Sequence, residues 1–114
     1  MKRVILESPY AGDLERNLAY ARLCMHDCLM RDEAPFASHL LYTQANVLDD
    51  NLANERELGI QAGFLWRQVA EKTVVYVDLG ISRGMQYGIE HAEKSGFPIE
   101  YRKLPKELMG KLPK

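Results

Sequence analysis

The sequence predicts an α/β protein with a three-layer, flavodoxin- or Rossmann-like fold around a short, mainly parallel four-stranded sheet. Apolar runs of strand length alternate along the chain with longer segments whose apolar residues follow helical spacing. The run 73–77 is β-branched or aromatic, which suits a central strand covered on both faces. The chain has 114 residues, enough for one domain and a modest core. We expect one domain over 1–101, right-handed crossovers, and a C-terminal extension over 102–114.

The N-terminal half is expected to supply two strands joined by a helix. Residues 3–6 are predicted to form the first strand, with a loop over 7–12. Asp13 can cap a helix that runs to about residue 31. Residues 35–41 are predicted to form a short second strand, followed by a polar loop through 49–51.

The next helix is predicted from a capping signal and an apolar face. Asn54 and Glu57 have the spacing of a capping box. The residues that follow at helical spacing on one face are Leu58, Ala62, Leu65 and Val69, with Trp66 beside them.

The C-terminal third begins with the buried strand 73–77. Ser82 can cap a helix over 82–95, and Gly96 suits the position after its end. A fourth strand is expected over 97–101. The proline- and lysine-containing tail after it is predicted to be loose or docked on a partner.

Charge and termini favour a cytoplasmic protein. The formal net charge is -1, which offers no electrostatic reason to expect nucleic acid or an acidic membrane as partner. The first apolar run, residues 4–6, is far too short for a signal peptide or a membrane span.

Neither a metal nor a cofactor is predicted. Cys24 and Cys28 lie four residues apart in a helix with His26 between them, which falls short of a zinc site and favours two buried apolar side chains. The acidic segment 49–51 lacks the spacing and glycine of an EF-hand. The chain contains no GxGxxG after the first strand, no Walker lysine and no Ser-His-Asp signature.

Three segments are expected to meet at the carboxyl edge of the sheet, where open α/β folds bind ligands: 7–12, 38–43 and 78–85. Backbone N–H groups at the helix start near Ser82 would attract phosphate or carboxylate. The candidate ligand-binding residues are Ser8, Pro9, Tyr10, Asn17, Ser38, His39, Asp78, Gly80, Ser82, Gly84 and Met85.

Three of these candidates have both a functional and a structural interpretation. Tyr10 could stack on a base or bind a sugar, or simply belong to a turn. His39 could bind a phosphate or act as acid or base, or be structural. Asp78 closes a buried strand and could bind a ribose hydroxyl, or cap the local turn.

Several short motifs together carry a family resemblance. They are Ser8-Pro9-Tyr10, Asn17, the segment 35–40, the segment 78–92 (DLGISRGMQYGIEHA) and Gly96-Phe97-Pro98-Ile99. Over about residues 3–101 the chain resembles the nucleoside 2-deoxyribosyltransferase-like family, which includes small uncharacterised phage and bacterial proteins.

The resemblance implies a nucleoside-sized pocket more than it implies the transferase reaction. In that family a helix glutamate attacks the anomeric carbon of a deoxynucleoside. The matching position is Gly84 when counted from Asp78, or Gly88 when counted back from Ala92. Glu90 is the nearest carboxylate, but it lies about 200° around the helix from Gly88.

Three functions remain open from the sequence. The first is binding of a nucleotide, nucleoside or ADP-ribose-like small molecule, with sequestration of a nucleotide signal in a phage setting. The second is a deoxyribosyltransferase or N-glycosidase with a rearranged site, in which Asp78 or Glu90 is catalytic and His39 handles the leaving base. The third is assembly into a homo-oligomer through apolar area at Phe64, Trp66, Met85 and Tyr87.

Overall fold

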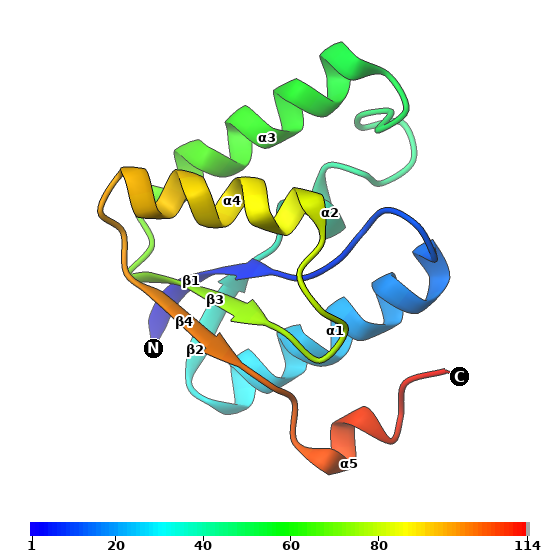
Figure 1. Cartoon of the computed structure of the whole chain (residues 1–114), viewed down its shortest axis with the longest axis vertical. Coiled ribbons are helices and arrows are strands. Elements are labelled where there is room, and N and C mark those ends of the chain that lie inside the picture. Colours follow the sequence, from blue (N-terminus) through cyan, green and yellow to red (C-terminus); the bar gives the residue numbers. More distant parts are fainter. Residues whose placement is uncertain (114) are drawn as a thin grey trace.

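The computed structural model describes residues 1–113 and confirms the predicted α/β class (Figure 1). Four parallel strands form one sheet in the order β2-β1-β3-β4, with helices on both faces. The elements in chain order are β1 (Lys2–Glu7), α1 (Leu14–Met30), β2 (Glu33–Phe36), α2 (Ser38–Leu41), α3 (Ala53–Arg67), β3 (Lys72–Tyr76), α4 (Arg83–Lys94), β4 (Ile99–Arg102) and α5 (Lys106–Met109).

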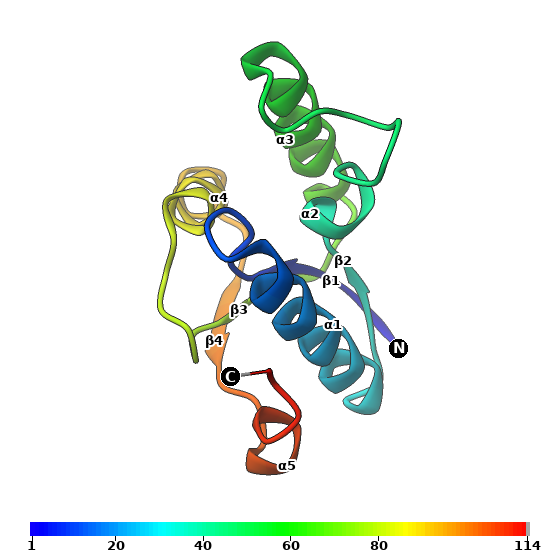
Figure 2. The same cartoon turned by 90° about the vertical axis from the view of Figure 1, so that its right-hand side faces the viewer.

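The two faces of the sheet are covered by different helices. Figures 1 and 2 show α1 and α5 on one face and α3 and α4 on the other. Val4, Leu6 and Val74 pack with α1 and the C-terminal segment, whereas Val75 packs with Met85 and Ile89 of α4. This division follows from the alternation of side chains along each strand.

The strand order creates a switch point between β1 and β3. From β1 the chain crosses to β2 on one side, and from β3 it crosses to β4 on the other. Since all the strands are parallel, the carboxyl ends of β1 and β3 lie side by side at one edge. Loops diverge at such a point and leave room for a ligand.

Helix capping was predicted correctly in two places and wrongly in one. The Asp13 carboxylate accepts from Arg16 N at 3.3 Å, and Ser82 Oγ accepts from Met85 N at 3.3 Å. Helix α3, however, has Leu52 at its N-cap, so the expected box between residues 54 and 57 does not form.

The predicted second strand, 35–41, was wrong in its bounds, because the strand begins at residue 33 and only residues 35 and 36 of the predicted range belong to it. Strand β2 ends at Phe36, and Ser38–Leu41 forms the short helix α2. Pro35 is tolerated because β2 is an edge strand that pairs only with β1.

The C-terminal tail is part of the core rather than a loose extension. Leu104 and Leu112 are buried with α1 residues, and α5 brings Leu108 and Met109 against the same cluster. Apolar burial therefore anchors a segment that its prolines and lysines suggested was loose.

The cysteine interpretation is confirmed, because Cys24 and Cys28 are free and fully buried on α1 while His26 is exposed. Burial raises the pKa of both thiols above their usual range. Among residues 1–113, no group of acidic, histidine and cysteine side chains is arranged to hold a metal ion. Over the same range, no helix has the length and apolar character needed to cross a membrane.

The apolar face of α3 is largely exposed. Leu58 and Leu65 are 60% and 65% exposed, and Val69, which was expected on the same face but lies two residues after the helix ends, is 53% exposed. Figure 2 shows the reason, since α3 extends away from the sheet beside α2. The sequence pattern therefore identifies a helix face that this chain does not cover by itself.

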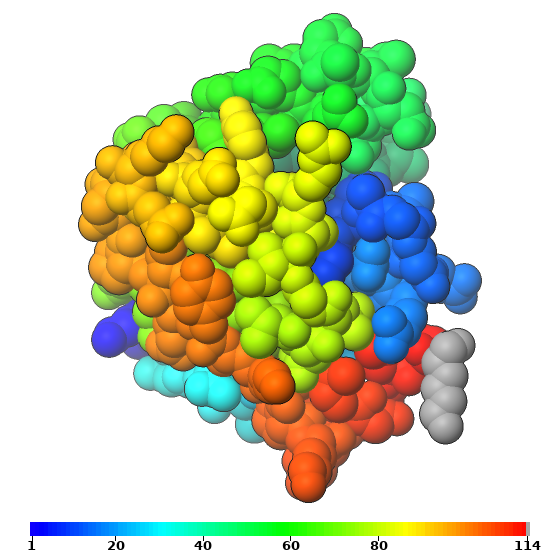
Figure 3. Space-filling view, viewed as in Figure 1, coloured from blue at the N-terminus to red at the C-terminus, as the bar shows by residue number. Residues whose placement is uncertain are grey.

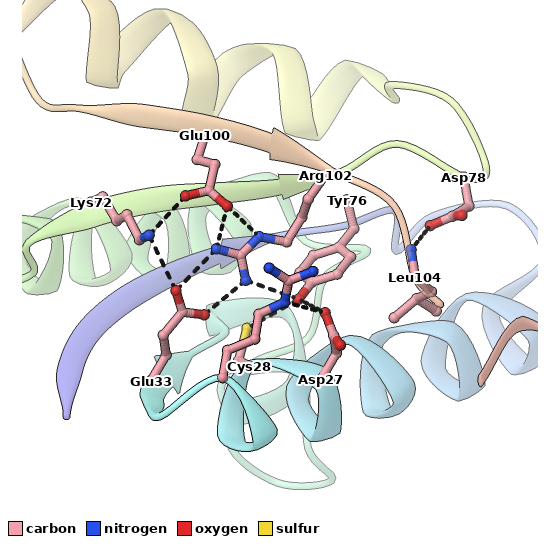
Figure 4. Close-up of polar contacts among 10 residues, drawn as sticks. Asp27, Cys28, Glu33, Lys72, Tyr76, Asp78, Glu100, Arg102 and Leu104 are labelled. Atoms are coloured by element: carbon pink, nitrogen blue, oxygen red, sulfur yellow. Dashed lines mark hydrogen bonds and ion pairs between the residues drawn. The ribbon is translucent and has the colours of Figure 1, made fainter. Parts of the chain in front are cut away.

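A buried ionic network ties β2, β3 and β4 together on the face of the sheet that α1 covers (Figure 4). Arg102 donates to both carboxylate oxygens of Glu33, at 2.8 and 3.0 Å, and Lys72 Nζ lies 3.2 Å from Glu33 Oε2. Glu100 accepts from both Arg102 and Lys72 at 2.8 Å. The Arg102 hydrogen bonds hold the pKa of Glu33 down at about 2.

Candidate functional site

A cavity of about 850 Å³ opens at the carboxyl edge of β1, between α3 and α4. Its lining includes residues from all three segments expected at this edge. Figure 3 shows the blue loop after β1 beside the yellow start of α4, with green α3 above both. We call this cavity the switch-point pocket.

The structure places seven of the eleven predicted ligand residues in the pocket lining. These are Ser8, Tyr10, Ser38, His39, Ser82, Gly84 and Met85. The other four, Pro9, Asn17, Asp78 and Gly80, do not line it.

Asn17 does not line the pocket but holds one of its loops in place. Its Nδ2 donates to the carbonyl oxygens of Tyr10 and Ala11, at 3.0 and 3.1 Å. Asn17 therefore holds the loop after β1 against the start of α1.

The two carboxylates considered for catalysis lie elsewhere. Asp78 Oδ2 accepts from Tyr20 Oη at 2.6 Å and from Leu104 N at 3.0 Å, which ties β3 to α1 and the tail. Glu90 is exposed on α4 and accepts from Gln86 at 3.3 Å. The structure brings neither group to the lining of the pocket.

Ser8 and His39 form a polar pair in the pocket wall. Ser8 Oγ lies 2.7 Å from His39 Nε2. Burial lowers the pKa of His39 to about 4, so the imidazole is neutral at pH 7. The pair can offer or accept a hydrogen bond, but at neutral pH it has no imidazolium to act as an acid.

Glu7 is the carboxylate that the sequence interpretation missed. The sequence predicts Glu7 in the loop 7–12, but it is the last residue of β1 and lines the pocket. Burial raises the pKa of Glu7 to about 7, against the opposing effect of Arg67. The sequence does contain a signal for Glu7, because it is a carboxylate that directly follows an apolar run. The same feature made Asp78 a candidate.

Arg67 holds the Glu7 carboxylate in place. Its Nη2 donates to Glu7 Oε2 at 2.7 Å, and Arg67 is only 2% exposed. The other guanidinium nitrogens are also engaged, with Nε donating to Thr73 Oγ1 at 3.1 Å and Nη1 to His91 Nδ1 at 2.9 Å. The guanidinium is therefore fixed by three elements of the fold.

Aromatic rings form two parts of the pocket wall. Phe64 stacks on Tyr87, with ring centroids 5.6 Å apart, and on His91 at 3.7 Å. Phe36 and Tyr42 pack edge to face at 6.0 Å, and both line the pocket. Flat apolar surfaces of this kind suit a planar ring.

Fold and site together define an α/β protein with an open pocket at its switch point. The chain belongs to the family described as "Domain of unknown function (DUF7768)", whose model matches residues 2–102. No curated protein matches the sequence.

One solved structure with a similar fold is the 2-deoxyribosyltransferase from the psychrotolerant bacterium Bacillus psychrosaccharolyticus, described as a biocatalyst for nucleoside synthesis. The TM-score is 0.60 at 13% sequence identity, and the match covers 89% of this chain and 72% of that chain. The two proteins therefore have a distant fold relationship.

Proposed function

We propose that the switch-point pocket binds a nucleoside, a nucleotide or an ADP-ribose-like small molecule. The observation that carries the proposal is a cavity of about 850 Å³ in which aromatic rings and one buried carboxylate converge at the sheet edge. This volume lies in the range typical of small-molecule sites, roughly 300–1,000 Å³.

The lining supplies a partner for each part of such a ligand. The exposed ring of Tyr87 beside Phe64 can stack on a base. The Glu7 carboxylate can accept hydrogen bonds from sugar hydroxyls. The N-terminus of α4, with Ser82 and Arg83 in the lining, can bind a phosphate.

The fold relationship supports the nucleoside class, since the similar structure is a 2-deoxyribosyltransferase. A protein that only binds would return its ligand unchanged. In a phage setting, such a protein would sequester a nucleotide signal.

Ligand-dependent thermal stabilisation tests the proposal. A ligand at a hundred times its Kd adds roughly 2.7 kcal/mol to the free energy of unfolding, because it binds only the folded state. We expect at least one compound in a panel of nucleosides, nucleotides and ADP-ribose derivatives to raise the Tm by several degrees.

Two tyrosine variants make this measurement specific. Tyr87→Ala should abolish most of the shift, because this ring lines the pocket. Tyr101→Ala is the matched control, because Tyr101 is about equally exposed but lies on β4 outside the lining. No shift with any compound would contradict the proposal.

We also propose that α3 pairs with α3 of a second copy of this chain. Leu58, Ala62 and Leu65 of α3 recur at the spacing of a coiled-coil seam, and Val69 follows at the same spacing two residues after the helix ends; the three larger side chains are mostly exposed. Met85, expected to contribute to such an interface, does not do so because it is 1% exposed in the core.

Light scattering at micromolar concentration tests this pairing. The protein should run as a dimer or larger assembly, and Leu65→Lys should convert it to a monomer. Leu29→Lys, at an exposed leucine of α1, should leave the assembly intact. A monomeric wild-type protein would overturn the proposal.

A further inference from the structure

We infer that Glu7 is the catalytic carboxylate of the switch-point pocket, and that it acts on the anomeric carbon of a bound N-glycoside. The inference rests on the proposed function, because it requires a ligand with a base joined to a sugar. It adds a reaction, hydrolysis of the glycosidic bond, and assigns that reaction to a strand residue.

Gly88 on α4 makes room for this carboxylate. A Cβ atom built at Gly88 would lie 2.8 Å from Glu7 Cδ, closer than normal packing allows, and 3.1 Å from Glu7 Oε1, which is a tight contact. Any other residue at 88 would therefore have to displace the Glu7 carboxyl group. The carboxylate from β1 occupies space that a side chain from the helix would otherwise fill.

The other glycine of α4, Gly84, shows that the close approach to Glu7 is specific to position 88. A Cβ at Gly84 would meet nothing within 4 Å, although Gly84 also lines the pocket. The close approach at Gly88 is thus a property of one position facing Glu7, and not of glycine in this helix generally.

Burial, partly offset by Arg67, keeps the Glu7 carboxyl group available in both protonation states near neutral pH. Arg67 of α3 is the charged group that contacts it; α4 presents Gly88, and His91 of α4 contacts Arg67 instead. With a pKa raised to about 7, the carboxyl group is partly ionised at pH 7 and mostly ionised at pH 8. The other charged or histidine side chains in the lining are His39, Asp50, Glu55, Arg56 and Arg83.

The proposed reaction has two balanced steps. An ionised Glu7 oxygen attacks the anomeric carbon; the new C–O bond forms as the C–N bond breaks, and the electron pair leaves on the base nitrogen, which takes a proton from solvent. Water then attacks the same carbon, the bond to Glu7 breaks, and its electron pair returns to the carboxylate while the water proton goes to solvent. The net change is N-glycoside plus water to free base plus sugar.

Base release from nucleosides, 2′-deoxynucleosides and their 5′-monophosphates tests the inference, with products separated by chromatography. The wild-type protein should release base from at least one compound that also stabilises it. Glu7→Gln should reduce release by about 100-fold or more even at a compound concentration that saturates the variant, because a glutamine oxygen can still accept from Arg67 and keep the protein folded but cannot attack the anomeric carbon. Stabilisation without release by the wild type would overturn the inference and leave the proposed function standing, whereas absence of both would overturn both.

Gly88→Ala provides an independent variant that keeps Glu7 in the sequence. Alanine suits a helix better than glycine, so α4 should form, but its methyl group should push the carboxyl group away and abolish base release. Gly110→Ala is the control, because its Cβ would make ordinary contacts in α5 far along the chain from the pocket. Normal release by a folded Gly88→Ala protein would also overturn the inference.

Discussion

Arg67→Met is expected to lower the free energy of unfolding by about 3–5 kcal/mol at pH 8, because it leaves the Glu7 carboxylate buried without its partner. The salt bridge is short, at 2.7 Å, and the Arg67 side chain is only 3% exposed. The variant also removes the hydrogen bonds to Thr73 and His91. Urea unfolding followed by circular dichroism measures the loss.

Two further variants show whether the Arg67→Met loss of stability comes from the buried Glu7 carboxylate that has no partner. Arg31→Met is the matched control, because Arg31 pairs with Asp27 but its side chain is 43% exposed; its cost should stay within about 1 kcal/mol. Adding Glu7→Gln to Arg67→Met should recover a large part of the stability. An Arg67→Met loss no greater than that of Arg31→Met would contradict the explanation.

The pH dependence of this loss has a definite sign. In the folded protein the pKa of Glu7 is about 7, above its ordinary value of 4.5. The folded state therefore binds more protons between these values, and the contribution of Glu7 to stability falls as pH rises from 4.5 through 7. Without Arg67 this pKa should rise further, so the Arg67→Met protein should gain stability relative to its Glu7→Gln double variant as pH is lowered from 8 to 5.

Local signals were sufficient where a residue acts on its own neighbours in the chain. Asp13 and Ser82 cap helices as expected, because a capping side chain bonds N–H groups two or three residues away. The alternation of strands and helices likewise predicts the sheet class. The prediction of a loose C-terminal tail was wrong for the converse reason. The burial of Leu104 and Leu112 depends on a surface of α1 that is distant in the chain, and not on local sequence.

The comparison of Glu7 with Asp78 shows what the local sequence cannot predict about the site. Both carboxylates come at the end of a buried strand, and nothing in the local sequence distinguishes them. Asp78 meets Tyr20 and the tail, whereas Glu7 meets Arg67 and the bare backbone of Gly88. The difference arises from which helix covers each strand end, and that is decided by the fold as a whole.

Arg102→Met is expected to cost about 3 kcal/mol of unfolding free energy at pH 7, because it removes the main partner of the buried Glu33 carboxylate. The Arg102 and Glu33 side chains are only 5% and 6% exposed, and two hydrogen bonds join them. Lys72 still reaches Glu33 at 3.2 Å, which limits the loss. Lys103→Met, at the exposed neighbouring position, should change stability by no more than about 0.5 kcal/mol.

Acid should narrow the gap between the wild type and Arg102→Met. The folded-state pKa of Glu33 is about 2, below its ordinary 4.5, so its contribution to stability is present above pH 4.5 and is lost as pH falls towards 2. Arg102 makes the largest hydrogen-bond contribution to this lowering, so the variant has less to lose over the same window. Urea midpoints measured from pH 5 to pH 2 should therefore converge. A gap that stays constant across that range would mean that Arg102 stabilises the sheet through its packing on Tyr76 rather than through Glu33.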